Sequence, residues 1–223
     1  MFEGSRFTVC DPGAGKIELI AAARDETPIR ELADVELSLG ERAPTVAFAM
    51  NGGMYDEDGR PIGLAIVEGR QVHAINIRKG GGNFHLMPNG VFEVRRDGRA
   101  AIVTSDKWAS SPDIRLATQS GPMLVIDGKL HPSFSPDGTS RYVRNGVGIA
   151  PGGRPLFVIS SDAVSLGKFA RFFRDQLKCR NALFLDGAVS ALWDPAAGRR
   201  DVTKPLGPII VAFKRPLGSM PHP

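Results

Sequence analysis

Residues 182–187 read Ala-Leu-Phe-Leu-Asp-Gly, four apolar residues that end at an acidic residue and a glycine. A short apolar run of this kind is typical of a buried strand, and glycine allows the backbone to turn sharply where the strand stops. We therefore predict a buried strand that delivers Asp186 to the edge of a sheet. The same pattern occurs at 46–50, a second apolar run that is followed by Asn51 and two glycines.

Four short turns separate the apolar or alternating segments of the chain, at 68–70, 97–99, 127–129 and 152–154. Each contains glycine beside a charged residue or a second glycine, a composition that favours tight hairpins. The glycines follow one another at intervals of 29, 30 and 25 residues, which is too irregular for a repeat fold. These turns indicate a mostly antiparallel sheet, which the apolar run at 209–213 closes.

Two helices are predicted. The first begins at Thr27 and ends at Gly40; its apolar face consists of Ile29, Leu32, Ala33 and Leu37. The second begins with Ser165 as N-cap; its apolar face consists of Leu166, Phe169, Phe173 and Leu177. The predicted fold class is α+β: a single domain over 1–215, a mixed and mostly antiparallel sheet built from hairpins with two main helices packed on it, and a polar tail at 216–223.

The composition excludes several classes of protein. In 223 residues, 42% are hydrophobic and 23% are charged, which is close to the average of globular proteins and excludes disorder. The net charge of +4 is too small to indicate a nucleic-acid partner, and no apolar stretch is long enough for a transmembrane helix. We predict no metal and no cofactor, since the histidines lack ligand spacing and the acidic run 56–59 fits a solvated turn better than a calcium loop.

The chain has two cysteines, Cys10 and Cys179. Two buried thiols are the simplest interpretation. A disulfide between them is the alternative, and we predict that the two residues lie close enough for one; it would indicate an oxidising compartment. The first residues do not resemble a signal peptide. The expected location is periplasmic or secreted if a leader has been removed, and cytoplasmic otherwise.

Four segments couple a polar side chain to a glycine at a predicted strand end: 50–55, 117–122, 141–149 and 185–190. Glycine lets the backbone approach a ligand and point N–H groups at it. If the strands that end at Asn51 and Asp186 are parallel neighbours, both side chains open on the same edge of a sheet. We predict that Asn51, Gln119, Arg144 and Asp186 converge on one pocket.

These four segments, in this order and at this separation, resemble the phosphodiester glycosidase family. The residues that carry the resemblance are Asn51-Gly52-Gly53, Gln119-Ser120-Gly121-Pro122, Arg144 before Val147-Gly148-Ile149, and Leu185-Asp186-Gly187. The family includes the domain of the mannose 6-phosphate uncovering enzyme, and the run 82–92 is similar to a bacterial branch of previously unknown function. The family's pattern continues after Leu-Asp-Gly with further glycine-like positions and paired serines. Here Ala188 and Val189 replace the glycines, Ser190 matches one serine, and Ala191 cannot take the role of the other.

The resemblance implies a hydrolase that cleaves the anomeric C–O bond of a sugar joined through phosphate to an alcohol. The transition state of such a reaction resembles an oxocarbenium ion. Phosphate leaves as a stable anion, so one carboxylate and one cation are expected to suffice. Asp186 is the one carboxylate of the four segments, and Arg144 has the planar fork that suits phosphate.

The roles are assigned as a hypothesis. Asp186 acts as nucleophile or general base, or stabilises positive charge at the anomeric carbon, and Arg144 holds the departing phosphate. The expected substrate-binding residues are Asn51, Gly52, Gly53, Gln119, Ser120, Gly121 and Ser190.

Structural interpretations stay open beside these roles. In the structural interpretation, Arg144 would form an ion pair with a carboxylate and Asp186 would cap a turn. Trp193 would belong either to the core or to a sugar-binding platform. His85 is the best candidate for a catalytic histidine. The competing function is a non-catalytic carbohydrate- or sugar-phosphate-binding module on the same fold.

Overall fold

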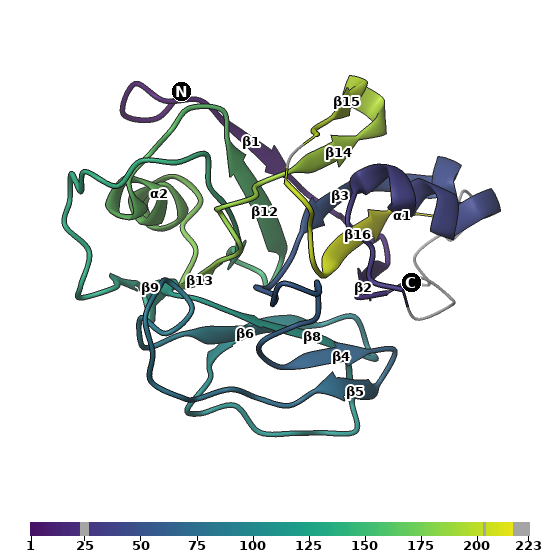
Figure 1. The fold of residues 1–223 in the computed structure, drawn as a ribbon. Coiled ribbons are helices and arrows are strands. Elements are labelled where there is room, and N and C mark those ends of the chain that lie inside the picture. The colour runs from purple at the N-terminus through teal and green to yellow at the C-terminus, as the bar shows by residue number, and fades with distance from the viewer. Residues whose placement is uncertain (23–26, 203, 216–223) are drawn as a thin grey trace.

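The computed structural model describes residues 1–22, 27–202 and 204–215, so the predicted tail at 216–223 lies outside the described residues. The strands form three sheets, and two helices cover two of them from outside (Figure 1). Every strand pair in the described part of the chain is antiparallel. The predicted α+β class is confirmed, but three sheets take the place of the single sheet that we expected.

The first sheet carries the strand that leads to Asp186. Its strand order is β1 (Phe7–Cys10), β12 (Pro155–Ser160), β11 (Asn145–Ile149), β13 (Asn181–Phe184), β9 (Met123–Ile126) and β10 (Lys129–Leu130). Helix α2 (Leu166–Arg171) and its π-helical continuation (Phe172–Gln176) pack on the outer face of this sheet through Phe169 and Phe173. The Ser165 side chain accepts a hydrogen bond from the backbone N–H of Lys168 at 3.1 Å, as predicted for an N-cap.

The second sheet carries the strand that ends at Asn51. Its strand order is β15 (Arg199–Arg200), β14 (Leu192–Asp194), β3 (Val46–Asn51), β16 (Ile209–Phe213) and β2 (Ile17–Ile20), with a 3-10 turn at Pro195–Ala197. Helix α1 (Leu32–Leu39) covers its outer face and is followed by a 3-10 helix (Gly40–Thr45). The predicted start at Thr27 is wrong: Glu31 is still extended, so the helix begins at Leu32. Leu37 was placed on the wrong face, because its side chain is 79% exposed.

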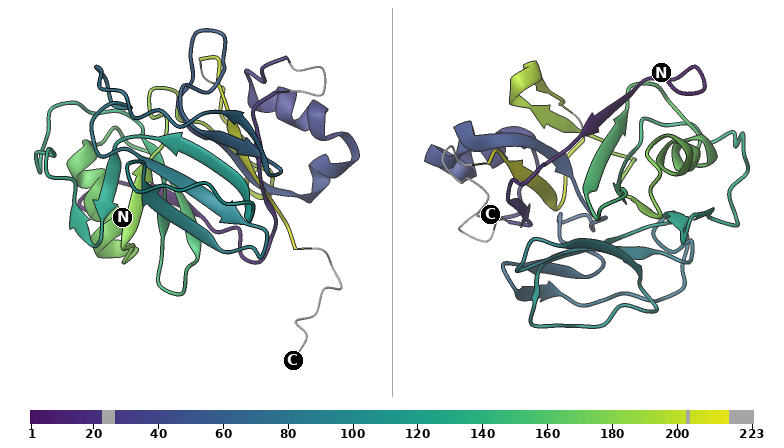
Figure 2. Two further views of the ribbon diagram at one scale, coloured as in Figure 1. Left: turned by 90° about the horizontal axis from the view of Figure 1, so that it is seen from below. Right: turned by 180° about the vertical axis from the view of Figure 1, so that it is seen from behind.

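The third sheet lies beneath the other two as a base (Figures 1 and 2). Its strand order is β5 (Arg70–His73), β4 (Ala65–Val67), β8 (Ile114–Ser120), β6 (Gly90–Arg95) and β7 (Ala100–Thr104). Side chains from all three sheets meet in one apolar cluster, to which Met50, Phe92 and Phe157 contribute. The candidate strands β3 and β13 are therefore fixed relative to each other by a common core.

All four predicted hairpin turns are present. They join β4 to β5, β6 to β7, β9 to β10, and β11 to β12. In two of them a non-glycine residue has positive φ, Glu68 and Asp127 at 48° each, and glycine follows at 81° and 79°. Local turn chemistry thus explains why these four strand pairs form. No described helix is long and apolar enough to cross a lipid bilayer.

The predicted proximity of Cys10 and Cys179 is wrong, and both residues are buried free thiols. Cys10 belongs to the apolar cluster between the sheets, whereas Cys179 packs with α2 on the outer face of the first sheet. The sheet itself therefore separates the two side chains. Burial raises the pKa of each thiol to about 12. Because the two thiols are not joined, the cysteines give no indication of an oxidising compartment.

We expect neither cysteine to react with a thiol reagent in the native protein, because both are buried and remain protonated at neutral pH. In denaturant without reductant, both should be labelled. Mass spectrometry of the alkylated protein measures this. A Ser110→Cys variant is the control that should be labelled while folded, because Ser110 is exposed. If Cys10 and Cys179 are not labelled in denaturant, the interpretation as free thiols is wrong and a disulfide is supported.

Candidate active site

The site forms where the ends of β13 and β3 meet. These strands belong to different sheets. They are therefore not the parallel neighbours that our prediction for Asn51 and Asp186 assumed. After β13 the chain leaves the first sheet, and the backbone N–H of Asp186 donates to the carbonyl of Gly52 at 3.2 Å. The loop at 186–191 then leads into β14, which pairs with β3. Asp186 and Asn51 are therefore brought together, as the strand-end pattern predicted.

Two buried asparagines hold this junction. The Asn145 amide donates to both the backbone and the side-chain oxygen of Asn51, each at 2.9 Å. Asn51 in turn donates to the carbonyl of Asp186 at 2.8 Å and accepts from the backbone N–H of Ala191 at 2.9 Å. The side chain of Asn51 thus fixes both ends of the loop that carries Asp186. Asn145 lies in a segment that the sequence marked, but its role was not predicted.

Ser190 fixes the same loop from the other side. Its hydroxyl lies 3.0 Å from the carbonyl of Val143 and 3.2 Å from the side-chain oxygen of Asn145, so it donates within the protein. The loop is therefore anchored to β11 as well as to β3.

The Asp186 carboxyl is half-buried, and among the described residues it has one hydrogen bond, in which Oδ1 accepts from the backbone N–H of Ala188 at 3.2 Å. Among the described residues, no cation forms an ion pair with it. Burial raises its pKa above the ordinary aspartate value. Burial also raises the pKa of Tyr55, and the negative charge of Asp186 adds to that shift. Tyr55, which donates to the carbonyl of Pro205, therefore lies within electrostatic range of the carboxyl.

Arg144 lies at the same edge of the first sheet as Asp186. The ladder between β11 and β13 pairs Gly146 with Phe184, and one more backbone hydrogen bond extends it. The next pair across the two strands would consist of Arg144 and Asp186. A Cβ atom built on Gly187 would lie 3.6 Å from the Cα of Arg144, so the two chain segments remain adjacent after the ladder ends.

The guanidinium of Arg144 is directed away from the carboxyl of Asp186. Its Nε donates to the carbonyl of Val164 at 2.7 Å and its Nη2 to that of Ser140 at 2.9 Å. Its central carbon lies 5.3 Å and 5.5 Å from the ring centroids of Phe184 and Tyr142. The side chain faces a hollow of about 430 Å³ that is lined mainly by the 133–140 loop.

The charge of Arg144 has no carboxylate partner in the described part of the chain, so the ion pair that the sequence left open as an alternative does not form. The residue is only 2% exposed, and burial lowers its pKa to about 10. Backbone carbonyls and aromatic faces thus stabilise this cation in place of an anion.

Gln119 is 1% exposed, and its side chain braces two loops. Oε1 accepts from the backbone N–H groups of Leu64 and Asn76 at 2.9 Å each, and Nε2 donates to the carbonyl of Asn76 at 2.7 Å and to Asn89 at 3.3 Å. These bonds use both donors and the acceptor oxygen of the amide. Of the four residues expected to converge, Asn51 and Asp186 meet, whereas the side chains of Gln119 and Arg144 point elsewhere.

The glycines near the site are needed for close packing. A Cβ atom on Gly53 would lie 2.4 Å from the carbonyl oxygen of Gln119, and one on Gly121 would lie 2.6 Å from the Cβ of Asn89. The N–H of Gly52 donates to the carbonyl of Pro208 at 2.7 Å. Ser120 is completely buried, and its hydroxyl has no partner among the described residues.

The remaining candidates have structural positions. Nδ1 of His85 lies 2.8 Å from the carbonyl of Arg78. Trp193 is 4% exposed and packs in the cluster beneath α1. It is therefore a core residue and not a sugar-binding platform. The acidic run is a turn in which Asp56 accepts from the backbone N–H of Arg60. In the described ranges no group of side chains has the composition of a metal site.

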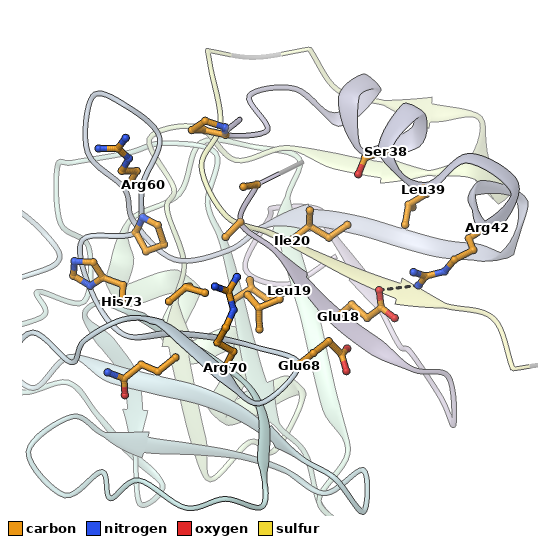
Figure 3. Close-up of a pocket in the computed structure, with 17 residues that line it drawn as sticks. Glu18, Leu19, Ile20, Ser38, Leu39, Arg42, Arg60, Glu68, Arg70 and His73 are labelled. Atoms are coloured by element: carbon orange, nitrogen blue, oxygen red, sulfur yellow. Dashed lines mark hydrogen bonds and ion pairs between the residues drawn. The ribbon is translucent and has the colours of Figure 1, made fainter. Parts of the chain in front are cut away.

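Two further hollows lie at the surface. One, of about 720 Å³, includes Gly187 and Ser190 of the loop that follows Asp186. The other, of about 660 Å³, lies between β2 and the β4–β5 hairpin (Figure 3). None of the predicted site residues lines this second hollow, and Arg42 and Glu18 on its rim pair with each other at 2.7 Å. The candidate site is therefore the junction at Asp186.

The chain is similar to known proteins in sequence and in fold. A family model for phosphodiester glycosidases matches residues 44–211. YigE, an uncharacterized protein of Escherichia coli K12, is 41% identical over 148 residues, which make up 66% of this chain and 58% of YigE. This chain therefore matches a little over half the length of that relative.

Two solved structures share the fold. One is the catalytic domain of zebrafish N-acetylglucosamine-1-phosphodiester alpha-N-acetylglucosaminidase, auto-inhibited by its pro-peptide; the TM-score is 0.66 at 17% identity, over 95% of this chain and 83% of that chain. The other is a candidate exported protein of Burkholderia pseudomallei K96243, with a TM-score of 0.56 at 12% identity, over 93% of this chain and 73% of that chain.

The asparagine pair yields a prediction about stability. Asn51→Ala and Asn145→Ala should each lower the free energy of unfolding by about 1–3 kcal/mol, because each leaves buried polar groups without partners. The double variant should lose less than the sum, since the two side chains share hydrogen bonds. Denaturant unfolding measures all three values. Asn83→Ala is the matched control and should change stability by less than about 0.5 kcal/mol, because Asn83 is exposed. Additive losses would contradict the proposed pairing.

Proposed function

The chain belongs to the phosphodiester glycosidase family, and from this we propose that it is a hydrolase that cleaves the anomeric C–O bond of a sugar phosphodiester. Water supplies the new oxygen at the anomeric carbon, and the electron pair of the broken bond stays with the phosphate. The products are a free sugar and a phosphate monoester. The observation that carries the proposal is the half-buried Asp186 carboxyl, which no cation neutralises in the described residues and which sits on a loop fixed at both ends.

Asp186 is proposed as the base that takes the proton from the attacking water. A raised pKa makes a carboxylate a stronger base, and burial raises that of Asp186. The anchoring of its loop by Asn51 and Ser190 supports this role, because a base must be held within hydrogen-bond distance of the water. In this proposal Asn51 and Ser190 position the carboxyl, whereas the Gln119 side chain braces other loops.

Arg144 is proposed as the phosphate ligand. Its Nη1 has no hydrogen bond among the described residues, and its uncompensated charge faces a hollow. Arg144 and Asp186 lie at the same edge of the first sheet. A phosphate there would accept from Nη1 and supply the missing negative charge.

We further propose a periplasmic or secreted location. Its support is the similarity in fold to a candidate exported protein. Fractionation of cells that express the natural gene, with an antibody against this chain, tests it. Recovery in the cytoplasmic fraction alone would contradict it.

Asp186→Asn should reduce kcat/KM for a chromogenic sugar phosphodiester by about a thousandfold, because an amide cannot accept the proton. In the wild-type protein, kcat/KM should fall as the pH is lowered, and this fall should occur at a higher pH than for an ordinary aspartate. Tight binding of sugar phosphates by a wild-type protein without turnover would instead identify a binding module.

The same substitution should affect stability in a pH-dependent way. Because the folded-state pKa of Asp186 is raised, its stabilising contribution is present below the unfolded-state pKa and is lost as the pH rises through the folded-state value. Asp186→Asn should therefore gain stability relative to wild type as the pH rises from about 3 to about 7. Thermal unfolding of both proteins across that range measures the gain, and a pH-independent difference would contradict the raised pKa.

Arg144→Lys should lower kcat/KM by about 10- to 100-fold, although the charge is kept, because the planar fork is lost. It should also reduce stability, since lysine cannot donate to both Val164 and Ser140. The control is Arg141→Lys, an exposed neighbour that should behave as wild type. If Arg144→Lys folds and has unchanged kcat/KM, Arg144 does not bind the phosphate.

A further inference from the structure

The hollow between β2 and the β4–β5 hairpin is bordered by the outer strands of two different sheets (Figure 3). In the described chain, β2 is an outer strand of the second sheet and β5 is an outer strand of the third. The outer strand of a sheet has backbone N–H and C=O groups on one side that no neighbouring strand pairs. This hollow, of about 660 Å³, therefore lies between two strand edges that can accept a further strand.

The register of β2 shows which of its backbone groups are open. The backbone N–H of Phe213 donates to the carbonyl of Lys16, and from there the hydrogen bonds to β16 alternate along β2. Glu18 therefore exchanges hydrogen bonds with β16, whereas the N–H and C=O of Leu19 point away from it. Neither group has a partner in the described part of the chain. Leu19 is only 3% exposed, and a buried backbone group without a partner costs free energy that an added hydrogen bond would recover.

The same edge already accepts one hydrogen bond from outside its sheet. By the same alternation, the carbonyl of Ile17 also points away from β16, and it accepts from Nη2 of Arg115 at 2.8 Å. A donor from the third sheet thus occupies the start of the β2 edge. Leu19 is the next outward position along the strand, and it is open.

The charges around this hollow are not balanced. Its two carboxylates, those of Glu18 and Glu68, are each paired with two cations of this chain. Arg70 of β5 is exposed and has no ion pair among the described residues. Arg60 lies 3.8 Å from the carboxylate of Asp58, and both side chains are 73% exposed. The charge left over for a ligand is therefore positive.

The rest of the lining is largely apolar. The apolar side chains that line the hollow include those of Leu19, Ile20, Leu39, Pro61, Val67 and Val72. An extended peptide has alternate side chains on each face and its backbone groups at its two sides. An unpaired strand edge, apolar walls and surplus arginine therefore suit an extended segment in which apolar and acidic residues alternate. A second copy of this chain suits the hollow less well, because two copies with a net charge of +4 each repel one another.

We propose that this hollow is a docking site for an extended acidic segment of another protein, which adds a strand to the second sheet beside β2. In this arrangement Leu19 exchanges backbone hydrogen bonds with the segment, and Arg70 binds its carboxylates. Main-chain pairing of this kind supplies affinity, and the side-chain contacts beside it supply specificity. None of the residues proposed for the reaction lines this hollow, so the inference does not depend on the proposed hydrolase function.

Amide hydrogen exchange, followed by NMR, tests whether the edge is open in the free protein. The amide of Leu19 should exchange at least about tenfold faster than that of Glu18, its neighbour in the same strand, because only Glu18 donates to β16. Equal exchange of the two amides would overturn the proposal, since the chain itself would then cover the edge. Protection of Leu19 that rises with protein concentration would also overturn it, because a second copy would then be the occupant.

The probe for the partner comes from a phage-displayed library of random peptides of about nine residues, selected on the full-length protein. The enriched peptides should carry a net negative charge and alternating apolar residues. Addition of the synthetic peptide should slow exchange of the Leu19 amide at least about tenfold and leave that of Glu18 unchanged. The proposal is overturned if no enriched peptide protects Leu19, or if the peptides that do so are not acidic.

Charge variants locate the contact. Fluorescence anisotropy with the same peptide should show binding weakened at least about tenfold by Arg70→Glu and less than about threefold by Arg70→Lys, because the positive charge is what attracts the acidic residues. Arg70 is exposed, so both variants should fold. Arg141→Glu is the matched control, an exposed arginine outside this hollow, and should bind the peptide as wild type does. An equal effect of Arg70→Glu and Arg141→Glu would overturn the docking site.

Discussion

The reciprocal amide contact between Asn51 and Asn145 is the interaction on which the rest of the site depends. It joins the end of a strand in the second sheet to the start of a strand in the first, in a position from which water is excluded. An asparagine amide has both donors and acceptors, so two of them can satisfy each other and still bind the backbone of a third segment. The Asp186 loop is that third segment. A hydrophobic pair could fill the same space, but it would leave the backbone groups of the loop without partners.

The two charged groups of the site are kept apart, and each is held in an unfavourable environment. Asp186 is half-buried beside no cation, and Arg144 is almost completely buried beside no anion, within the described chain. Direct pairing would relieve both groups and leave neither available to a ligand. That the two groups form no ion pair in the described chain is consistent with a site that an anionic, polarised substrate completes.

Some of this was predictable from the sequence, for reasons that particular residues make clear. The four hairpins follow from turn residues such as Asp127 and Gly128, whose backbone preference is local. The strand ends at Asn51 and Asp186 follow from apolar runs that stop at a polar residue and glycine. The direction of the Gln119 side chain, the partner of Asn145 and the separation of Cys10 from Cys179 depend on how three sheets pack, and no local pattern encodes that. Thr27 and Pro28 carried a helix-start signal, yet the helix begins only at Leu32.

The distances along the chain between the parts of the junction have a consequence for folding. Asn51 is 94 residues from Asn145 and 135 residues from Asp186. Closing loops of that length costs conformational entropy before stabilising contacts can form. Topologies of this kind therefore fold slowly. The hairpins have short loops and can form early, whereas the junction requires two finished sheets to dock. A ribosome-bound chain that has not yet released residue 186 therefore has most of its strands but no site.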